Sequence, residues 1–198
     1  MKEKFLNNSV SFITKYNNTY SRDDIDKIKY GLEGLYLTVT KLIIIILISI
    51  ILGIFKELLL VLIFFNIIRY PAFGVHADKS ITCLITSTTI IIGLTFLIIN
   101  TPIPIINKII ISILSFIDYL LFAPADTIKR PLTNKRKRKY RKIASCVVSL
   151  IYIIIIFTIK NDLISNTILT ALIIEALLIN PCIYKLLGMP YNNYKKSA

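Results

Sequence analysis

Long apolar runs alternate with short polar turns along most of this 198-residue chain. Residues 42–52, for example, are all leucine or isoleucine except for Ser49. A run of about 18 or more apolar residues is typical of a bilayer-spanning helix, because a helix satisfies its own backbone hydrogen bonds in lipid. A membrane β-barrel would instead alternate polar and apolar residues. Six such segments are predicted, at residues 35–55, 57–73, 81–99, 103–122, 143–160 and 163–187.

Polar residues and prolines divide these segments. Pro102 and Pro104 mark the turn between the third and fourth segments, and Asn161-Asp162 marks the turn between the fifth and sixth. Residues 1–34 are polar overall, with apolar residues at helical spacing, which is typical of amphipathic helices on a membrane surface. The pattern therefore predicts an all-α, polytopic membrane protein: an amphipathic region at 1–34, six transmembrane helices within 35–187, and a tail at 188–198.

The distribution of positive charge along the chain predicts its orientation in the membrane. The chain carries a formal charge of +13, yet it has no motif of a nucleic-acid-binding fold, so we expect no nucleic-acid partner. With a cytoplasmic N-terminus and six spans, 21 of the 24 lysines and arginines fall on the cytoplasmic side. Because cytoplasmic loops collect positive charge, this predicts a multi-pass cell-membrane protein with both termini in the cytoplasm.

The candidate chemistry lies in a single histidine and a nearby cysteine. The chain has one histidine, His76, and three cysteines, whose spacing fits no zinc site, so we expect no metal or other cofactor. A histidine and a thiol are the smallest set for nucleophilic catalysis near neutral pH. Cys83 follows His76 by seven residues. The plainer interpretation is an interfacial histidine and a buried thiol that acts as a small apolar residue.

Helix geometry constrains the catalytic interpretation. Seven residues of straight helix would separate His76 and Cys83 by roughly 10.5 Å, whereas a catalytic pair approaches to roughly 3–4 Å. If the pair acts together, the chain must bend between them. Pro71 and Gly74 supply a break, and Asp78 or Ser80 could cap the next helix. Cys83 would then lie near a helix N-terminus, where the dipole favours a thiolate.

At this point several motifs together resemble the AgrB family, the accessory gene regulator B membrane endopeptidases of Gram-positive quorum sensing. The resemblance covers roughly residues 25–187. Its most specific part is Gly74-Val-His76-Ala with Cys83 at its spacing, joined to six apolar segments. It also includes the stretches Tyr30–Gly34, Arg69–Ala77, Phe122–Thr127, Lys129–Leu132 and Lys135–Lys142, with Glu175 and Pro181.

The resemblance implies a function on the cytoplasmic face of a bacterial cell membrane. The enzyme would cleave the C-terminal part from a short AgrD-like propeptide, hold the remainder as a thioester on Cys83, and release it as a cyclic thiolactone or lactone. His76 would move the protons. The family also implies a homodimer. A non-enzymatic membrane transport or partner-binding module is the alternative, and a metalloprotease lacks the ligands.

Other residues have two interpretations each. Arg69 either binds substrate or anchors the chain at the interface, and Gly74 permits the turn before His76. Glu33 either orients His76, binds substrate, or is an ordinary surface carboxylate. Three acidic residues in or beside apolar segments are either functional or paired with the basic loop: Asp118, Asp126 and Glu175.

A basic loop is predicted at 124–142, within the cytoplasmic region. Its candidate binding residues are Lys129, Arg130, Lys135, Arg136 and Lys137. The run first determines topology. It could also attract anionic membrane lipid or the acidic tail of the propeptide.

Overall fold

A computed structural model describes residues 2–16, 20–75, 80–127 and 131–195. Within them the chain is mainly helical, and an isolated parallel bridge joins Phe73 and Ala125. The all-α prediction is confirmed. The chain forms two compact units, Met1–Ile48 and Ser49–Ala198. The helices are α1 (Lys2–Tyr16), α2 (Arg22–Ile51), α3 (Phe55–Ala72), α4 (Ser80–Asn100), α5 (Ile105–Phe122), α6 (Lys135–Thr158), α7 (Asp162–Ile179) and α8 (Pro181–Leu186), with a 3-10 turn at Asn193–Lys195.

The first unit contains α1 and most of α2. Ser21 and Asp24 form a capping box at the start of α2: the Ser21 hydroxyl lies 2.7 Å from Asp24 Oδ2, and the Asp24 N–H donates to Ser21 Oγ. From there α2 continues to Ile51 without a break, so the predicted boundary at residue 34 does not coincide with a helix end. On α1, Leu6 is buried, and the Phe5 ring lies 5.3 Å from that of Tyr36.

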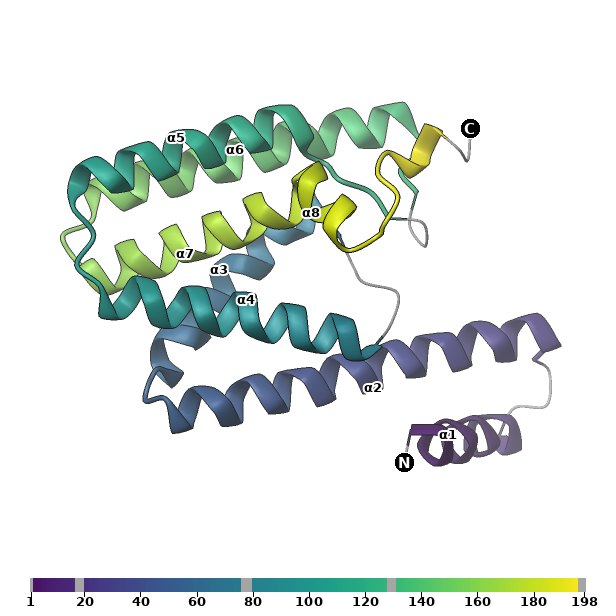
Figure 1. The fold of residues 1–198 in the computed structure, drawn as a ribbon. Helices are drawn as coiled ribbons and strands as arrows, with labels where there is room; N and C mark the ends of the chain where they lie inside the picture. The colour runs from purple at the N-terminus through teal and green to yellow at the C-terminus, as the bar shows by residue number, and fades with distance from the viewer. Residues whose placement is uncertain (1, 17–19, 76–79, 128–130, 196–198) are drawn as a thin grey trace. The chain divides into compact units, whose positions relative to one another are not determined.

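In the second unit, α7 is the central helix. It contacts α3, α4, α5 and α6, and Figure 1 shows it between the α5–α6 pair and the α3–α4 pair. Most of its residues are buried, whereas the neighbouring helices each bury one face. The elements around the α3–α4 turn are therefore positioned by a helix from the far end of the chain.

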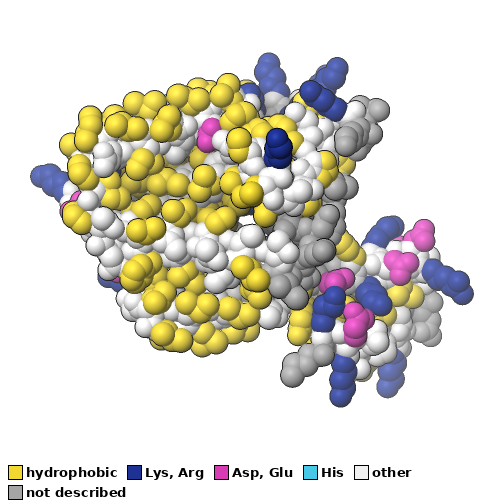
Figure 2. Space-filling view, viewed as in Figure 1, with side chains coloured by type: hydrophobic (Ala, Val, Ile, Leu, Met, Phe, Trp, Pro, Cys, Tyr) yellow, Lys and Arg dark blue, Asp and Glu magenta, His cyan; other side chains and the backbone are white. Residues whose placement is uncertain are grey.

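Helices α5 and α6 bury small polar side chains and expose most of their apolar ones. Helix α5 buries Lys108, Ser112, Ser115 and Tyr119, and its isoleucines and leucines face outward. Figure 2 shows hydrophobic side chains over much of this unit's visible surface. An apolar exterior suits lipid, and small serines let helices approach closely. The buried Lys108 Nζ donates to Ser165 Oγ on α7 at 3.1 Å.

The six predicted segments correspond to α2–α7, but six spans are not confirmed. Among the described residues, four helices are long and apolar enough to cross a membrane: α2, α5, α6 and α7. Helix α3 carries Lys56, Glu57 and Arg69, and the apolar part of α4 is shorter, at Leu84–Asn100.

Two segment ends differ from the sequence prediction. The basic run 135–142 is helical and opens α6, where we expected a loop, because Asn134 caps the helix and accepts from the N–H groups of Arg136 and Lys137. The sixth segment breaks at Asn180, whose side chain accepts from Cys182 N–H and so starts α8. Pro181 suits the first position of that helix.

The turn between α3 and α4 distinguishes six spans from four. If six helices cross and the N-terminus is cytoplasmic, Lys79 faces the cytoplasm; if α3 and α4 do not cross, it faces outward. In a chain with its three cysteines replaced by serine, we expect Lys79→Cys to react with a membrane-impermeant maleimide only after the cells are permeabilised. Labelling in intact cells would contradict six spans. Thr101→Cys is the matched control, because its turn is external in both arrangements and should label in intact cells.

Candidate functional site

The turn that follows α3 is held by backbone hydrogen bonds from two distant segments. Gly74 N–H donates to the Ala125 carbonyl at 2.8 Å, and Ala125 N–H donates back to the Ala72 carbonyl at 3.0 Å. Val75 N–H donates to the Leu178 carbonyl at the end of α7, at 2.9 Å. Residues 72–75, which lead directly to His76, are therefore fixed between the α5–α6 connection and α7.

The Arg69 side chain also holds this turn through hydrogen bonds. Its Nη1 lies 3.0 Å from Glu175 Oε2, and its Nη2 donates to the carbonyls of Gly74 at 3.3 Å and Val75 at 3.0 Å. The Glu175 side chain is fully buried and that of Arg69 is 15% exposed. The guanidinium is thus turned toward α7 and the backbone of the turn, while the predicted role of Arg69 in binding substrate or anchoring the chain stays a prediction. Glu175 pairs with Arg69, not with the basic run.

Gly74 is required by the space around it as well as by its backbone. Its φ of +108° is a conformation that residues with a side chain rarely adopt. A Cβ would lie 3.0 Å from the Leu178 carbonyl oxygen and would collide with Arg69 Nη1. The predicted role of Gly74 in permitting the turn agrees with this geometry.

The described residues show a break in the helix ahead of His76, whereas a bend between His76 and Cys83 would fall on residues 76–79, which lie outside the described ranges. Helix α3 ends at Ala72 and α4 begins at Ser80, so no straight helix runs through 74–83. Cys83 is in the first turn of α4, but its side chain and that of Ser80 lie outside the described residues, as does His76. The approach of His76 to Cys83 therefore stays a prediction.

Asp126, which the sequence left with alternatives, accepts three backbone hydrogen bonds. Its carboxylate takes the N–H groups of Leu132 at 3.2 Å, Asn193 at 2.9 Å and Tyr194 at 2.7 Å. Asp126 is 2% exposed, so these donors replace water and the basic run does not. Asp118 likewise pairs elsewhere, accepting from Asn180 Nδ2 at 3.3 Å.

The basic run divides between two faces of α6. Arg141 Nη1 donates to the Tyr70 carbonyl at 2.7 Å, and Arg138 lies over the Tyr194 ring, 3.8 Å from its centroid. These two arginines are half-buried. The exposed cations on the first turns are Lys135, Arg136, Lys137, Lys139 and Lys142. Lys129 and Arg130 lie outside the described residues.

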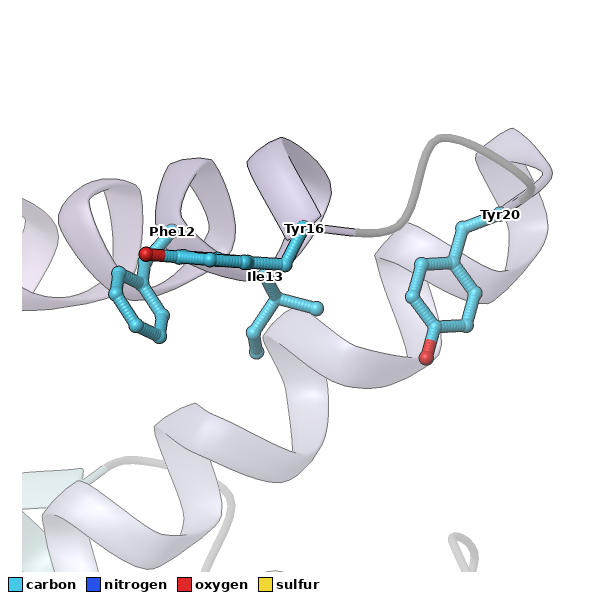
Figure 3. A pocket seen from close by; sticks show the side chains of 4 residues that line it. All are labelled: Phe12, Ile13, Tyr16 and Tyr20. Carbon is cyan, nitrogen blue, oxygen red and sulfur yellow. The ribbon is translucent and has the colours of Figure 1, made fainter.

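Glu33 belongs to the first unit, where its described partner is Lys2 of α1. Lys2 Nζ lies 2.7 Å from Glu33 Oε1, and this hydrogen bond raises the pKa of Lys2. The first unit also has an open pocket lined by Phe12, Ile13, Tyr16 and Tyr20 (Figure 3). The pocket combines no nucleophile with a base, so the α3–α4 turn is the better candidate site. Within the described ranges no three acidic, histidine or cysteine residues cluster to hold a metal.

Breaking the buried ion pair tests whether it supports the fold. We expect Glu175→Ala to lower the free energy of unfolding by about 3–5 kcal/mol, because the Arg69 guanidinium would stay buried without a carboxylate. SDS titration in mixed micelles measures the change. Asp162→Ala is the control on the same helix: its 93% exposed side chain lies 3.8 Å from Lys108 Nζ. It should cost about 0–1 kcal/mol. Equal losses for the two variants would contradict the assignment.

A methyl group at position 74 tests the turn. We expect Gly74→Ala to lower the free energy of unfolding by about 1–3 kcal/mol through backbone strain, and by more if Arg69 is displaced. Gly93→Ala is the control, since a Cβ there meets no atom within 4 Å. Alanine favours a helix interior over glycine, so Gly93→Ala should be neutral or stabilise by about 1 kcal/mol. A Gly74→Ala protein as stable as wild type would refute the steric argument.

Comparisons with known proteins identify the family of this chain. The family model "Accessory gene regulator B" matches residues 6–179. An AgrB-like protein of Clostridium acetobutylicum is 31% identical over 175 residues, covering 86% of this chain and 82% of the relative. One of Listeria innocua is 33% identical, covering 86% and 83%. The accessory gene regulator protein B of Staphylococcus carnosus is 34% identical, covering 68% and 70%. No solved structure matches. The chain belongs to the AgrB family.

Proposed function

We propose that this protein is a membrane cysteine endopeptidase that cleaves and cyclises an AgrD-like autoinducer propeptide. Membership of the AgrB family supports a role in processing a quorum-sensing autoinducer. The observation that carries the finer proposal is the pinned break between α3 and α4. It ends one helix before His76 and starts the next at Ser80, three residues before Cys83.

The position of Cys83 in the first turn of α4 favours a reactive thiol. The positive end of the helix dipole stabilises a thiolate, and a nearby imidazole does so further. Ser80, the first residue of α4, is proposed to support this helix start. His76, on the segment that leads from the clamped turn to α4, is proposed to fold back over the first turn and accept the thiol proton.

The proposed reaction has two acyl transfers. The Cys83 thiolate attacks the scissile carbonyl, a C–S bond forms, the C–N bond breaks, and His76 gives its proton to the leaving amine. The substrate's own thiol or hydroxyl then attacks the thioester, which releases a cyclic thiolactone or lactone and restores Cys83. With a substrate thiol, the second step exchanges one thioester for another, so proximity suffices to favour it. Exclusion of water at the membrane interface protects the intermediate from hydrolysis.

Substrate docking is proposed at the exposed basic face that opens α6. The five outward cations there suit the acidic tail of a propeptide, and anionic lipid at the same leaflet would add to the attraction. Lys129 and Arg130, just upstream in the sequence, extend the same positive segment. Glu33 remains a candidate for contact with substrate. A cytoplasmic site, cytoplasmic termini and a homodimer complete the proposal.

Substitution of the two candidate catalytic residues separates an enzyme from a non-enzymatic membrane module. We expect Cys83→Ala and His76→Ala each to reduce processing of a co-expressed propeptide at least about 100-fold, because each removes a group that takes part in bond breaking. Immunoblots of whole cells measure the cleaved product, and membrane fractions show that insertion is intact. Cys146→Ala and Cys182→Ala are matched controls that should process normally.

Trapping the intermediate makes the test sharper. When the ring-closing residue of the propeptide is replaced by alanine, we expect its N-terminal part to accumulate on Cys83 as an adduct that hydroxylamine removes. Normal processing by Cys83→Ala or by His76→Ala would reject the cysteine endopeptidase and favour a different catalytic set.

A further inference from the structure

The connection between α5 and α6 is the backbone partner of the turn that leads to His76. Ala125 both accepts from Gly74 N–H and donates to the Ala72 carbonyl, and it is 1% exposed. Any displacement of Ala125 would therefore move residues 72–74. What holds Ala125 in place then bears on the geometry of the site.

Residues 193–195 of the C-terminal segment hold this connection through the Asp126 carboxylate. Two of the three backbone N–H groups that its carboxylate accepts belong to the tail: Asn193 donates to Oδ1, and Tyr194 donates to Oδ2. A buried carboxylate that lost these donors would be strongly destabilised. The neighbour of Ala125 is thus fixed by residues nearly 70 positions further along the chain.

Two tyrosine hydroxyls also hold the connection between α5 and α6. Tyr184 of α8 donates its hydroxyl toward the carbonyls of Ala125 at 3.1 Å and Asp126 at 3.0 Å. The Tyr191 hydroxyl donates to the Phe122 carbonyl at 3.3 Å, and burial raises the pKa of Tyr191 to about 12, which keeps that hydroxyl a donor at neutral pH. The whole connection is therefore tied to α8 and the tail.

Residues 193–195 also contact α6. Arg138 lies over the Tyr194 ring, and Asn193 Nδ2 donates to the Asp126 carbonyl at 3.4 Å. The tail thus binds the start of α6 and the α5–α6 connection together. Residues beside the predicted reacting groups are supported from three parts of the sequence: α7, the connection and the tail.

We propose that Asp126, together with residues 193–195, is a positioning device that sets the turn before His76 through the Ala125 backbone. This inference rests on the proposed function, because it assigns a purpose to the turn as the support of a catalytic histidine. In this proposal Asp126 is a positioning residue that acts by fixing Ala125. The predicted consequence of its loss is a weaker coupling of His76 to Cys83 while the helices remain in place.

The pH dependence of Cys83 alkylation by iodoacetamide reports that coupling without any propeptide. The measurement uses the full chain with Cys146→Ser and Cys182→Ser, so that Cys83 is the one thiol. We expect His76→Ala to shift the alkylation profile to higher pH, toward that of an ordinary thiol near about 8.5. Asp126→Asn, and separately a chain that ends at Asn192, should shift it in the same direction.

Processing kinetics supply the second readout. Both variants should reduce the turnover rate at saturating propeptide roughly 10–100-fold with little change in KM, since a displacement of about 1 Å is enough for such a loss. Combining Asp126→Asn with the chain that ends at Asn192 should be no worse than the more severe single change. Non-additivity is expected when two changes break one connected set of contacts.

Two controls distinguish the loss of the contacts made by residues 193–195 from a general destabilisation of the protein. A chain that ends at Lys195 keeps residues 193–195 and should behave as wild type. Tyr194→Ala keeps the backbone donor to Asp126 but loses the ring contact with Arg138, so it should reduce activity less than the chain that ends at Asn192 does. If Asp126→Asn fails to fold, the comparison of the two shortened chains decides alone.

The outcomes distinguish this inference from the proposed function. If His76→Ala shifts the profile but neither Asp126→Asn nor the chain ending at Asn192 does, the positioning role is overturned and the enzyme stands. If His76→Ala does not shift the profile, the His76–Cys83 couple fails, and the positioning role fails with it.

Discussion

A buried ion pair between Arg69 and Glu175 fixes the geometry of the second unit around its candidate site. Charges are expensive away from water, and further hydrogen bonds to the partners of a buried pair offset part of that cost. Arg69 makes such bonds to the Gly74 and Val75 carbonyls as well as to the carboxylate. One guanidinium therefore joins α3, α7 and the turn, and moving any of them leaves a charge or a carbonyl unpaired.

The turn depends on that pair and constrains the sequence around it. The guanidinium occupies the space where a Cβ would stand at position 74, which leaves glycine as the residue that fits. The bond from Val75 to Leu178 then sends the chain away from the α3 axis at the end of α7. Chain direction matters here, because seven residues of straight helix would hold a histidine and a cysteine two turns apart.

Local patterns predicted the helical segments, the break after Pro71 and the need for glycine at position 74. Each of these follows from residues close together in sequence. The Arg69–Glu175 pair joins positions 106 residues apart, and no periodicity connects them. The partners of Asp126 could not be predicted either, because a backbone N–H group does not depend on which side chain its residue carries. The helical start of α6 could have been predicted, because Asn134 before the basic run is an N-cap signal, but Thr133-Asn134 suggested the start of a mobile loop instead.

The positive charges at the start of α6 repel one another and the helix dipole. Seven lysines and arginines occupy residues 135–142, at the end of the helix where the macrodipole is already positive. Asn134 satisfies two backbone N–H groups but supplies no negative charge. Arg138 and Arg141 relieve part of the repulsion through aromatic rings and the Tyr70 carbonyl. Within the described ranges no such contact is seen for the outward cations, so an anionic partner on that face would stabilise the helix start as it binds. This physical reason supports the proposal that an acidic propeptide tail docks on the exposed face of α6.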